Sequence, residues 1–565
     1  MNKNIFLEKK WIVLIQALPR RERFFAWGLI VVSAVGLLAW LIALYISATM
    51  PIPKAGGKYI EGIVGQPAYI NPLLSQTSES DADLSALVYA GLFVHDASGQ
   101  PMPRLAESFA LSSDGKEYTI KIRENIRFQD GTPMTVDDVI FTLQAIQDPA
   151  YRSPLRQNWQ GVEISSPDER TIVFSLKKAY FGFLENLTVG ILPKHIWQSI
   201  PPEKFALAES NLMPIGAGPY QFSDLKKDAE GNILWYELKA NETYFSGRPY
   251  IDTFNFRFYP DEDSLFLAYK QGEVMGMASI RAAHIDEVLQ KKSTRLHELH
   301  LPRAFSVFFN TSKSAAVAFS EVREALSLAT DRSAIVRDTL SGRGIVATTP
   351  FLPFMNGYDA EISTRNFDME RAKSLLDERG WKQGDDGVRE RQGTRLEFEL
   401  LVPEWPELER TASQLQGMWE GIGAKVTITT QNIATLQQDR IRPREYHALL
   451  FGQASLADPD PYSFWHSKER EDPGLNLSSL DEQAVDDILL QAREITNSEE
   501  RAGKYADFQR IFLEKNPAIF LYSPSYLYVT TDRIQGIRVE TIDMPSDRFG
   551  LVSEWYLNTK RVWKK

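Results

Sequence analysis

Two acidic side chains, Asp458 and Asp460 on either side of Pro459, are the first candidates for chemistry in this sequence. Two carboxyl groups a short distance apart can divide the roles of general acid and general base in glycoside hydrolysis. The same Asp-Pro-Asp sequence is also typical of a turn, in which aspartate oxygens accept backbone N–H hydrogen bonds. No second motif supports hydrolysis, so the sequence favours a turn over a catalytic pair.

Other reactive residue types give no catalytic signal. The seven histidines form no HExxH and no other metal or triad spacing, and only His297 and His300 are close together. No G-x-S-x-G elbow and no phosphate-binding GxxxxGK(S/T) loop is present. The chain has no cysteine, which excludes disulfides, zinc-thiolate sites, a cysteine nucleophile and a lipid-modified N-terminal cysteine. We therefore expect no catalytic residue, no metal site and no cofactor.

Length and composition indicate a globular protein of several domains. The chain has 565 residues, of which 43% are apolar and 24% charged, enough for two or three domains. The net charge is -11 and the body has no long basic block. Phosphate binding needs clustered Lys and Arg, so nucleic acid is excluded as the main ligand.

An apolar segment near the N-terminus predicts a membrane anchor. Phe24 to Ile46 contains no charged residue, and a helix of this length would reach roughly 35 Å, enough to cross a hydrocarbon core. More basic residues precede this segment than follow it closely, which predicts a cytoplasmic N-terminus. The basic residues before it are Lys3, Lys9, Lys10, Arg20, Arg21 and Arg23, and those just after it are Lys54 and Lys58.

The alternative interpretation of this segment is a cleaved signal peptide. The charged leader is long, the apolar run exceeds a normal signal-peptide core, and Ile46-Ser47-Ala48 is a poor cleavage site. These features favour an uncleaved signal anchor, with everything after Ser47 outside the cytoplasm.

The stretch from Leu105 to Leu143 has clear local signals for a strand followed by a helix. Alternating apolar and polar residues predict a half-buried strand, and Asp-Gly pairs predict tight turns before and after it. A threonine three residues before an aspartate predicts a capping box at the start of the helix. The residues concerned are Tyr118, Ile120 and Ile122 for the strand, Asp114-Gly115 and Asp130-Gly131 for the turns, and Thr135 with Asp138 for the cap.

This stretch resembles extracellular solute-binding proteins of family 5, the oligopeptide, dipeptide and nickel receptors of ABC importers. Further segments match the family in order between Tyr59 and Gly536. They are Asn71-Pro72-Leu73, a helix expected over Leu84–Leu92, Pro214–Tyr220 with Ala217 where the family has threonine, and residues 308–336. Periodicity adds helices over residues 366–381, 415–423 and 500–515 and strands over residues 396–402, 425–429 and 518–529.

The resemblance implies an α/β fold of the two-lobe periplasmic-binding-protein type II, in the large variant with an extra subdomain, preceded by one transmembrane helix. The expected organisation is a cytoplasmic segment 1–23, an anchor 24–46, a linker 47–57, lobe I 58–304 with the extra subdomain at about 90–213, lobe II 305–525, and a C-terminal return to lobe I 526–565.

One departure from the family concerns the ligand's amino group. Peptide-binding members hold that group with an aspartate three residues before an Asp-Pro pair. Here Ser455 occupies that position, or Ala457 if Asp460-Pro461 is the matching pair. Neither side chain can form a charge-assisted bond. Either Asp458 or Asp460 takes this role, or the ligand is not a peptide with a free amine.

Other candidate ligand contacts are expected in loops at strand ends, where open α/β sheets bind ligands. Trp405 could stack on a ligand and Arg410 could meet a carboxylate, although burial under a loop and a solvated helix turn are the respective structural alternatives. The full set of expected ligand-binding residues is Asn71, Trp405, Arg410, Ser455, Asp458, Asp460 and Trp465.

The resemblance implies a receptor that encloses a peptide or other small solute between its lobes and delivers it to ABC permease subunits with a cytoplasmic ATPase. Such a protein is no enzyme, is held at the cell membrane by its N-terminal helix, and faces the periplasm or cell surface. Two alternatives stay open: a surface hydrolase that uses Asp458 and Asp460, and an extracytoplasmic chaperone or adhesion protein.

Overall fold

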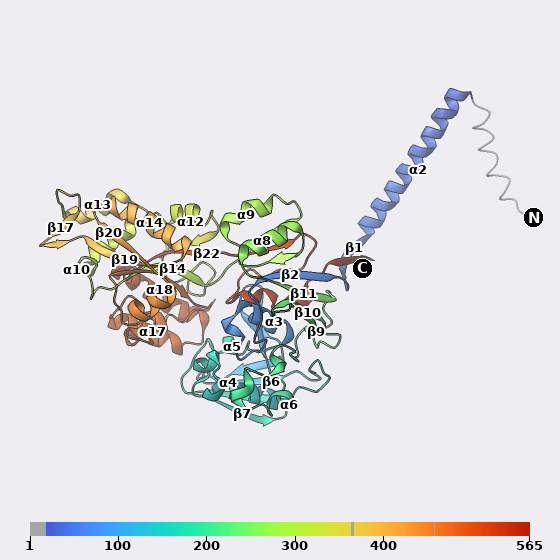
Figure 1. Ribbon diagram of the computed structural model, residues 1–565, viewed down its shortest axis with the longest axis horizontal. Helices are drawn as coiled ribbons and strands as arrows, with labels where there is room; N and C mark the ends of the chain where they lie inside the picture. Colours follow the sequence, from blue (N-terminus) through green and yellow to red (C-terminus); the bar gives the residue numbers. More distant parts are fainter. Residues whose placement is uncertain (1–18, 363–365, 457, 565) are drawn as a thin grey trace, which may run out of the picture. The chain divides into compact units, whose positions relative to one another are not determined.

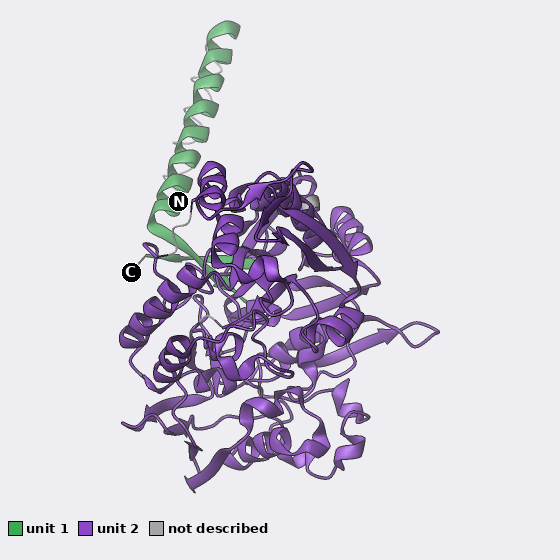
Figure 2. Cartoon of the chain, turned by 90° about the vertical axis from the view of Figure 1, so that its left-hand side faces the viewer, with its two compact units in different colours: residues 1–56, 556–565 green, residues 57–555 purple. Residues whose placement is uncertain are grey.

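The structure, a computed structural model, describes residues 19–362, 366–456 and 458–564. The chain forms two compact units (Figure 2). Unit 1 consists of the chain before Gly57 and after Trp555, and unit 2 is Gly57–Trp555. Most of the expected cytoplasmic segment, residues 1–18, and the alternative family position Ala457 lie outside the described residues.

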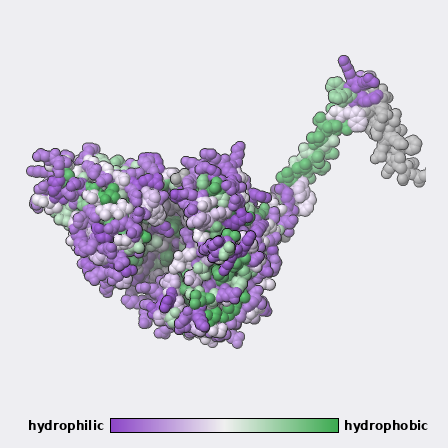
Figure 3. Space-filling view, in the orientation of Figure 1, coloured by the Kyte–Doolittle hydropathy of each residue, from purple (hydrophilic) through white to green (hydrophobic). Residues whose placement is uncertain are grey.

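Unit 1 contains the apolar helix α2 (Arg20–Ala48) and a two-stranded antiparallel ribbon, β1 (Thr49–Lys54) with β24 (Asn558–Trp563). The helix extends the predicted 24–46 segment at both ends, and none of its residues is buried. It is long and apolar enough to cross a membrane, and Figure 3 shows its hydrophobic surface. The side chain of Arg561 donates hydrogen bonds to the oxygens of Ile46 and Thr49 at 2.8 to 3.0 Å, which joins the ribbon to the end of the helix.

Lobe I of unit 2 is built on a seven-stranded mixed sheet (Figure 1). Its strands, in spatial order, are β13 (Thr294–Leu299), β23 (Tyr526–Thr531), β12 (Gly276–Met277), β2 (Lys58–Val64), β11 (Thr253–Tyr259), β10 (Ile233–Ala240) and β9 (Tyr220–Lys227). The associated helices are α3 (Glu79–Val88), α8 (Glu262–Gln271) and α9 (Ala282–Leu289). One core of this lobe lies between the sheet and α8 and α9, with Leu265, Tyr269 and Val529 among its buried residues.

Helix α3 differs from the expected Leu84–Leu92 helix. It begins earlier, after the N-cap Ser78, and ends at Val88. The reason is tertiary pairing: Gly91 forms a bridge with Gly190, and Phe93 N–H donates to the carbonyl of Leu187. Residues after Val88 are therefore extended and lead into the short strands β3 (Phe93–His95) and β4 (Pro101–Pro103).

The extra subdomain contains a four-stranded antiparallel sheet of order β5 (Ala106–Leu111), β6 (Glu117–Ile122), β8 (Thr171–Leu176) and β7 (Val162–Asp168). Tyr118, Ile120 and Ile122 are buried, which confirms the predicted strand face. Asp138 accepts a hydrogen bond from Thr135 N at 2.8 Å, as a capping box requires. The helices of this part are α4 (Val136–Gln147), α5 (Phe183–Asn186), α6 (Lys194–Trp197) and α7 (Pro202–Phe205).

Lobe II is built on a six-stranded mixed sheet of order β15 (Gly344–Val346), β22 (Ala518–Pro524), β14 (Arg303–Phe309), β21 (Ala448–Ala454), β19 (Glu397–Pro403) and β20 (Lys425–Gln431). The larger helices are α11 (Ser320–Leu328), α12 (Arg332–Thr339), α13 (Met369–Glu378), α14 (Pro406–Glu420), α17 (Gln483–Glu494) and α18 (Ser498–Lys515). The shorter elements are α10 (Ala315–Ala318), α15 (Ile433–Leu436), α16 (Tyr462–Trp465), β16 (Lys382–Gln383), β17 (Arg389–Arg391) and β18 (Thr394–Arg395). Two cores flank the sheet, one with α11 to α14 and the other with α16 to α18.

The chain passes between the two large sheets at two places. β13 belongs to lobe I and β14 to lobe II, with residues 300–302 between them. β22 belongs to lobe II and β23 to lobe I, with Ser525 alone between them. The prediction of one strand over residues 518–529 is therefore wrong, because two strands of different sheets follow one another in the same alternating pattern.

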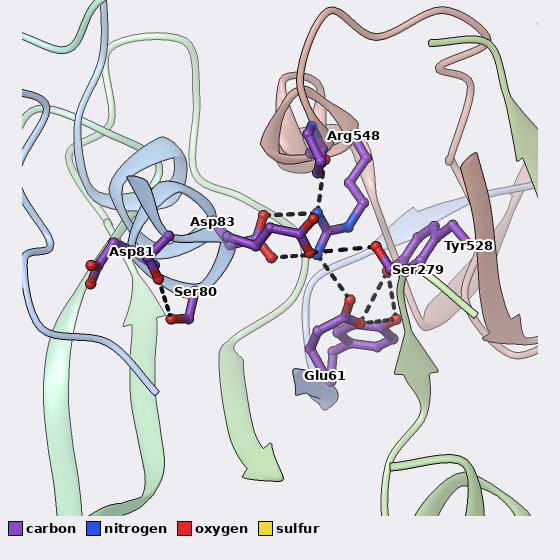
Figure 4. A network of polar contacts seen from close by, with 11 residues as sticks. Glu61, Ser80, Asp81, Asp83, Ser279, Tyr528 and Arg548 are labelled. Atoms are coloured by element: carbon purple, nitrogen blue, oxygen red, sulfur yellow. Dashed lines mark hydrogen bonds and ion pairs between the residues drawn. The ribbon is translucent and has the colours of Figure 1, made fainter. Parts of the chain in front are cut away.

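A buried polar network ties the C-terminal return to lobe I (Figure 4). Arg548 forms an ion pair with Asp83 on α3, with its Nη1 donating at 2.8 Å, and lies 3.3 Å from a carboxylate oxygen of Glu61 on β2. The hydroxyls of Tyr59 and Tyr528 lie 2.9 and 3.1 Å from the other Glu61 oxygen. Burial raises the pKa of Glu61 to about 7, although Arg548 acts in the opposite direction.

Candidate functional site

A cavity of about 400 Å³ lies where α3, the extra subdomain and the C-terminal return meet. Lobe I supplies most of its wall, and Leu456, which follows β21, contributes to it from lobe II. In the space-filling view, unit 2 is hollowed between its two lobes (Figure 3). The wall combines apolar and aromatic groups with a few charged side chains, the composition expected of a small-molecule site. Representative members are Ser75, Tyr89, Trp159, Tyr180 and Met544.

The charged part of the wall is centred on His95, the last residue of β3. Its Nε2 lies 2.6 Å from an oxygen of Glu185 and 3.4 Å from an oxygen of Asp543, and its Nδ1 lies 3.4 Å from Asp547. Burial alone lowers the pKa of this histidine, but the carboxylates of Asp547 and Glu185 outweigh it and raise the pKa of His95 to about 11. The imidazole is therefore protonated at neutral pH, and three carboxylates share it.

Local structure positions these carboxylates. Glu185 lies on the single-turn helix α5, and its carboxylate contacts His95 at the end of β3. The Asp547 carboxylate accepts hydrogen bonds from the backbone N–H groups of Asp543 at 3.0 Å and Met544 at 2.9 Å. These bonds fix the conformation of the loop formed by residues 543–547. The oxygens of Glu185 and Asp543 and the imidazole nitrogen of His95 all lie within 4.8 Å of one another, close enough to hold a metal ion. No spacing motif predicts this group, because it joins three distant segments of the chain.

The predicted residues Asp458 and Asp460 each bind an arginine of lobe II. Arg501 donates to Asp458 at 2.6 Å, and the Asn356 amide donates to the same carboxylate at 2.9 Å. Arg493 donates to Asp460 through Nε at 2.8 Å. Burial raises the pKa of Asp458, while Arg501 opposes this rise. These contacts give both carboxylates a structural explanation, and ligand binding by them stays a prediction.

Three further residues predicted to bind the ligand make hydrogen bonds or packing contacts within the protein. Asn71 is fully buried: its amide donates to Asn211 at 3.0 Å and its carbonyl accepts from Leu73 N at 3.0 Å. Trp465 has no exposed surface and packs in the core beside α17 and α18. The backbone N–H of Ser455 donates to the carbonyl of Pro302 at 2.7 Å.

Trp405 and Arg410 are more accessible. Trp405 precedes α14, is 45% exposed, and contacts the ring of Phe305 edge-on at 5.8 Å. Arg410 lies on the exposed first part of α14, 3.6 Å from Glu407. Neither residue is part of the cavity wall, so a role for them in ligand contact stays a prediction.

Comparison with known proteins identifies the family. Residues 100–473 match the middle region of bacterial extracellular solute-binding proteins, family 5. Oligopeptide-binding protein AppA of Bacillus subtilis is 26% identical over 518 residues, with 89% of this chain and 92% of AppA covered. The dipeptide-binding protein of Escherichia coli is 25% identical, with 85% of this chain and 91% of that protein covered.

Solved structures agree with this assignment. AppA of Bacillus subtilis in complex with a nonapeptide covers 90% of this chain and 100% of its own, at 26% identity and a TM-score of 0.68. The structure of NikZ of Campylobacter jejuni in complex with Ni(L-His) covers 89% of this chain and 100% of the NikZ chain, at 26% identity and a TM-score of 0.69. The predicted two-lobe α/β fold is thereby confirmed, and the chain belongs to the bacterial extracellular solute-binding proteins of family 5.

Proposed function

We propose that this protein is the membrane-anchored, extracytoplasmic receptor of an ABC importer and that it delivers a peptide or similar small solute to a permease. The observation that carries the proposal is the cavity, whose wall combines lobe I residues with Leu456 of lobe II. A solute that contacts both lobes favours the closed state over the open one. Residues 300–302 and Ser525, where the chain passes between the sheets, are the proposed hinges.

The relatives support a peptide as the solute. The AppA structure contains a nonapeptide, and the E. coli relative is a dipeptide-binding protein. A cavity of about 400 Å³ suits a short peptide or a solute of similar size, within the range typical of small-molecule sites.

Native mass spectrometry of the full chain, extracted from membranes in mild detergent, tests this proposal. We expect a non-covalent adduct whose mass identifies the solute, and saturable binding of that solute by calorimetry. Absence of any adduct, together with no saturable binding of di-, tri- or nonapeptides, would contradict a receptor function.

We also propose that helix α2 is an uncleaved anchor. The support lies in unit 1, where Arg561 of the C-terminal strand donates hydrogen bonds to oxygens of Ile46 and Thr49 at the end of the helix. The ring of Tyr45 also contacts Trp563 edge-on at 6.1 Å. The intact mass of membrane-extracted protein should include the helix, whereas a mature N-terminus after Ile46 would show that it is a signal peptide.

The hydrolase alternative has less support than the receptor. A general acid and a general base must both reach the substrate, and Asp458 and Asp460 are already bound by Arg501 and Arg493. We therefore propose that the protein catalyses no reaction and that these two acids have a structural role.

A further inference from the structure

The ribbon of β1 and β24 follows the apolar helix directly (Figure 1). Helix α2 ends at Ala48 and β1 begins at Thr49, so no linker separates them. The C-terminal segment is joined to the same point, because the Lys564 N–H donates to the carbonyl of Ala48 at 2.9 Å. With α2 as the proposed anchor, the ribbon therefore begins at the membrane surface.

The ribbon and the residues beside it carry positive charge only. Residues 47–56 and 556–564 contain three lysines and one arginine but no acid, in a chain whose net charge is -11. Arg561 acts within unit 1, where it donates hydrogen bonds to oxygens of Ile46 and Thr49. The three lysines are exposed, and the ribbon has no carboxylate of its own to neutralise them; they are Lys54, Lys560 and Lys564. This surface is complementary in charge to anionic groups.

The two faces of the ribbon differ in composition. Side chains alternate along a strand and paired residues share a face, so the register of β1 with β24 assigns each side chain. One face carries Trp563 and Arg561, which contact Tyr45 and the end of α2. The opposite face, here named the lysine face, consists of Met50, Ile52, Lys54, Asn558, Lys560 and Val562. Apolar side chains beside lysines are typical of segments that lie in the membrane interface.

The ribbon has almost no core of its own. Only Thr49 is buried in the two strands, while Met50 is 44% exposed and Trp563 is 66% exposed. A two-stranded ribbon of this kind is at best marginally stable in water. Tryptophan and tyrosine are enriched at the boundary of the membrane, and Trp563 contacts Tyr45 in the last turn of α2. A lipid surface would cover the apolar groups and neutralise the lysines together.

Given the proposed uncleaved anchor, we infer that the ribbon is a second membrane-binding element whose lysine face lies along the lipid surface. Lys54 and Lys560, with Lys564 directly after β24, bind the phosphates of anionic lipid headgroups. Lysine binds phosphate as a compact point charge through charge-assisted hydrogen bonds. Each lysine near an anionic surface strengthens binding by about fivefold.

The length of the strands distinguishes a ribbon that lies on the membrane from one that stands upright. Asn558 pairs with Lys54 at the far end of the ribbon, about 17 Å from Thr49 along the strand. The headgroup layer on each side of a bilayer is only roughly 6 Å thick. An upright ribbon would therefore hold Asn558 in water, whereas a ribbon on the surface holds it among the headgroups.

Spin labels at the far end of the ribbon test the inference on the full chain in lipid nanodiscs. The chain has no cysteine, so Asn558→Cys and Thr559→Cys each provide a single labelling site. Asn558 lies on the lysine face, and Thr559, which pairs with Pro53, lies on the opposite face. In discs that contain phosphatidylglycerol, we expect the Asn558→Cys label to be shielded from a water-soluble nickel chelate and the Thr559→Cys label to be accessible. Equal accessibility of the two labels would overturn the inference.

The charge of the lipid and of the lysines is tested with the Asn558→Cys label. The combined changes Lys54→Gln, Lys560→Gln and Lys564→Gln should weaken docking by roughly 100-fold and make the label accessible. Discs of phosphatidylcholine alone should have the same effect, as should about 1 M salt, which shortens the screening length to about 3 Å. Shielding that none of these changes alters would overturn the role of the lysines. A label that is accessible in both kinds of disc would overturn the lipid assignment.

A matched control removes the same charge from unit 2. The combined changes Lys226→Gln, Lys227→Gln and Lys239→Gln replace three exposed lysines of β9 and β10. This variant should leave the Asn558→Cys label shielded. Loss of shielding in the control equal to that in the ribbon variant would overturn the assignment to the ribbon.

The intact mass of the labelled chain separates this inference from the anchor proposal. A chain that retains α2 but has an accessible Asn558→Cys label would overturn the inference and leave the anchor in place. A chain that lacks α2 after extraction from membranes would overturn both.

Discussion

The Asp458-Pro459-Asp460 loop of lobe II and the His95 cluster of lobe I both bury carboxylates, but they balance the charge differently. In the loop each acid has its own guanidinium, Arg501 for Asp458 and Arg493 for Asp460. In the cluster three acids lie within 3.4 Å of one imidazolium. Pairing each acid with its own arginine fixes the loop within lobe II, whereas in the cluster a single imidazolium joins carboxylates from separate segments of the chain.

The largest expected effect tests the pairing in the loop. Arg501→Met should lower the free energy of unfolding by about 3 kcal/mol, because it leaves the Asp458 carboxylate partly buried without its cation. The Arg501 side chain is only 3% exposed. Urea denaturation followed by tryptophan fluorescence measures the change.

Arg510→Met is the control for this measurement. Arg510 pairs with Asp507 on the same helix, and the two side chains are 60% and 55% exposed. The control should change the free energy of unfolding by less than about 0.5 kcal/mol. A cost for Arg501→Met no larger than this would show that the loop pairs do not stabilise the fold.

The second prediction concerns the pH dependence of the His95 cluster. The carboxylates around His95 raise its folded-state pKa from the ordinary value of about 6.5 to about 11. The stability that it contributes is therefore fully present below pH 6.5 and is lost as the pH rises toward 11. His95→Gln should therefore destabilise the protein by roughly 2 kcal/mol at pH 6 and by less at pH 9.5. Urea denaturation at the two pH values checks the sign, and an equal loss at both would contradict a protonated imidazole.

The smallest expected effect concerns a contact between Arg501 of α18 and the extra subdomain. The guanidinium of Arg501 lies 3.5 Å from the ring centroid of Phe181. Phe181→Leu keeps an apolar side chain but removes the aromatic face, and it should cost about 1 kcal/mol of unfolding free energy. A double-mutant cycle with Arg501→Met measures the coupling between the two residues. Additive effects would mean that the ring and the cation do not interact.

Local patterns predicted the secondary structure well, since strand alternation and caps depend on neighbouring residues. The sequence predicts the buried strand face formed by Tyr118, Ile120 and Ile122. It also predicts the hydrogen bond that Asp138 accepts from Thr135 N. The division at Ser525 does not, because β22 and β23 share one alternating pattern and only their partner strands distinguish them.

The candidate site was harder to predict for a related reason. Asp458 and Asp460 stand out in the sequence. Their arginine partners, however, lie 43 and 33 residues further along the chain, on α18 and α17, and only the tertiary fold places them beside the loop. His95 meets Glu185 from 90 residues away and meets Asp543 and Asp547 through the C-terminal return. Spacing rules detect ligand sets on one helix or loop, and this set is assembled by tertiary structure alone.

The ribbon of β1 and β24 gives the chain a property that a single linker would lack. Unit 2 is joined to unit 1 by two covalent connections, one before Gly57 and one after Trp555, and the two strands are held to each other along their whole length. A protease that cuts either connection once therefore leaves the body attached to the apolar helix through the other. Release into the surroundings requires two cuts, or one cut and the unzipping of the ribbon.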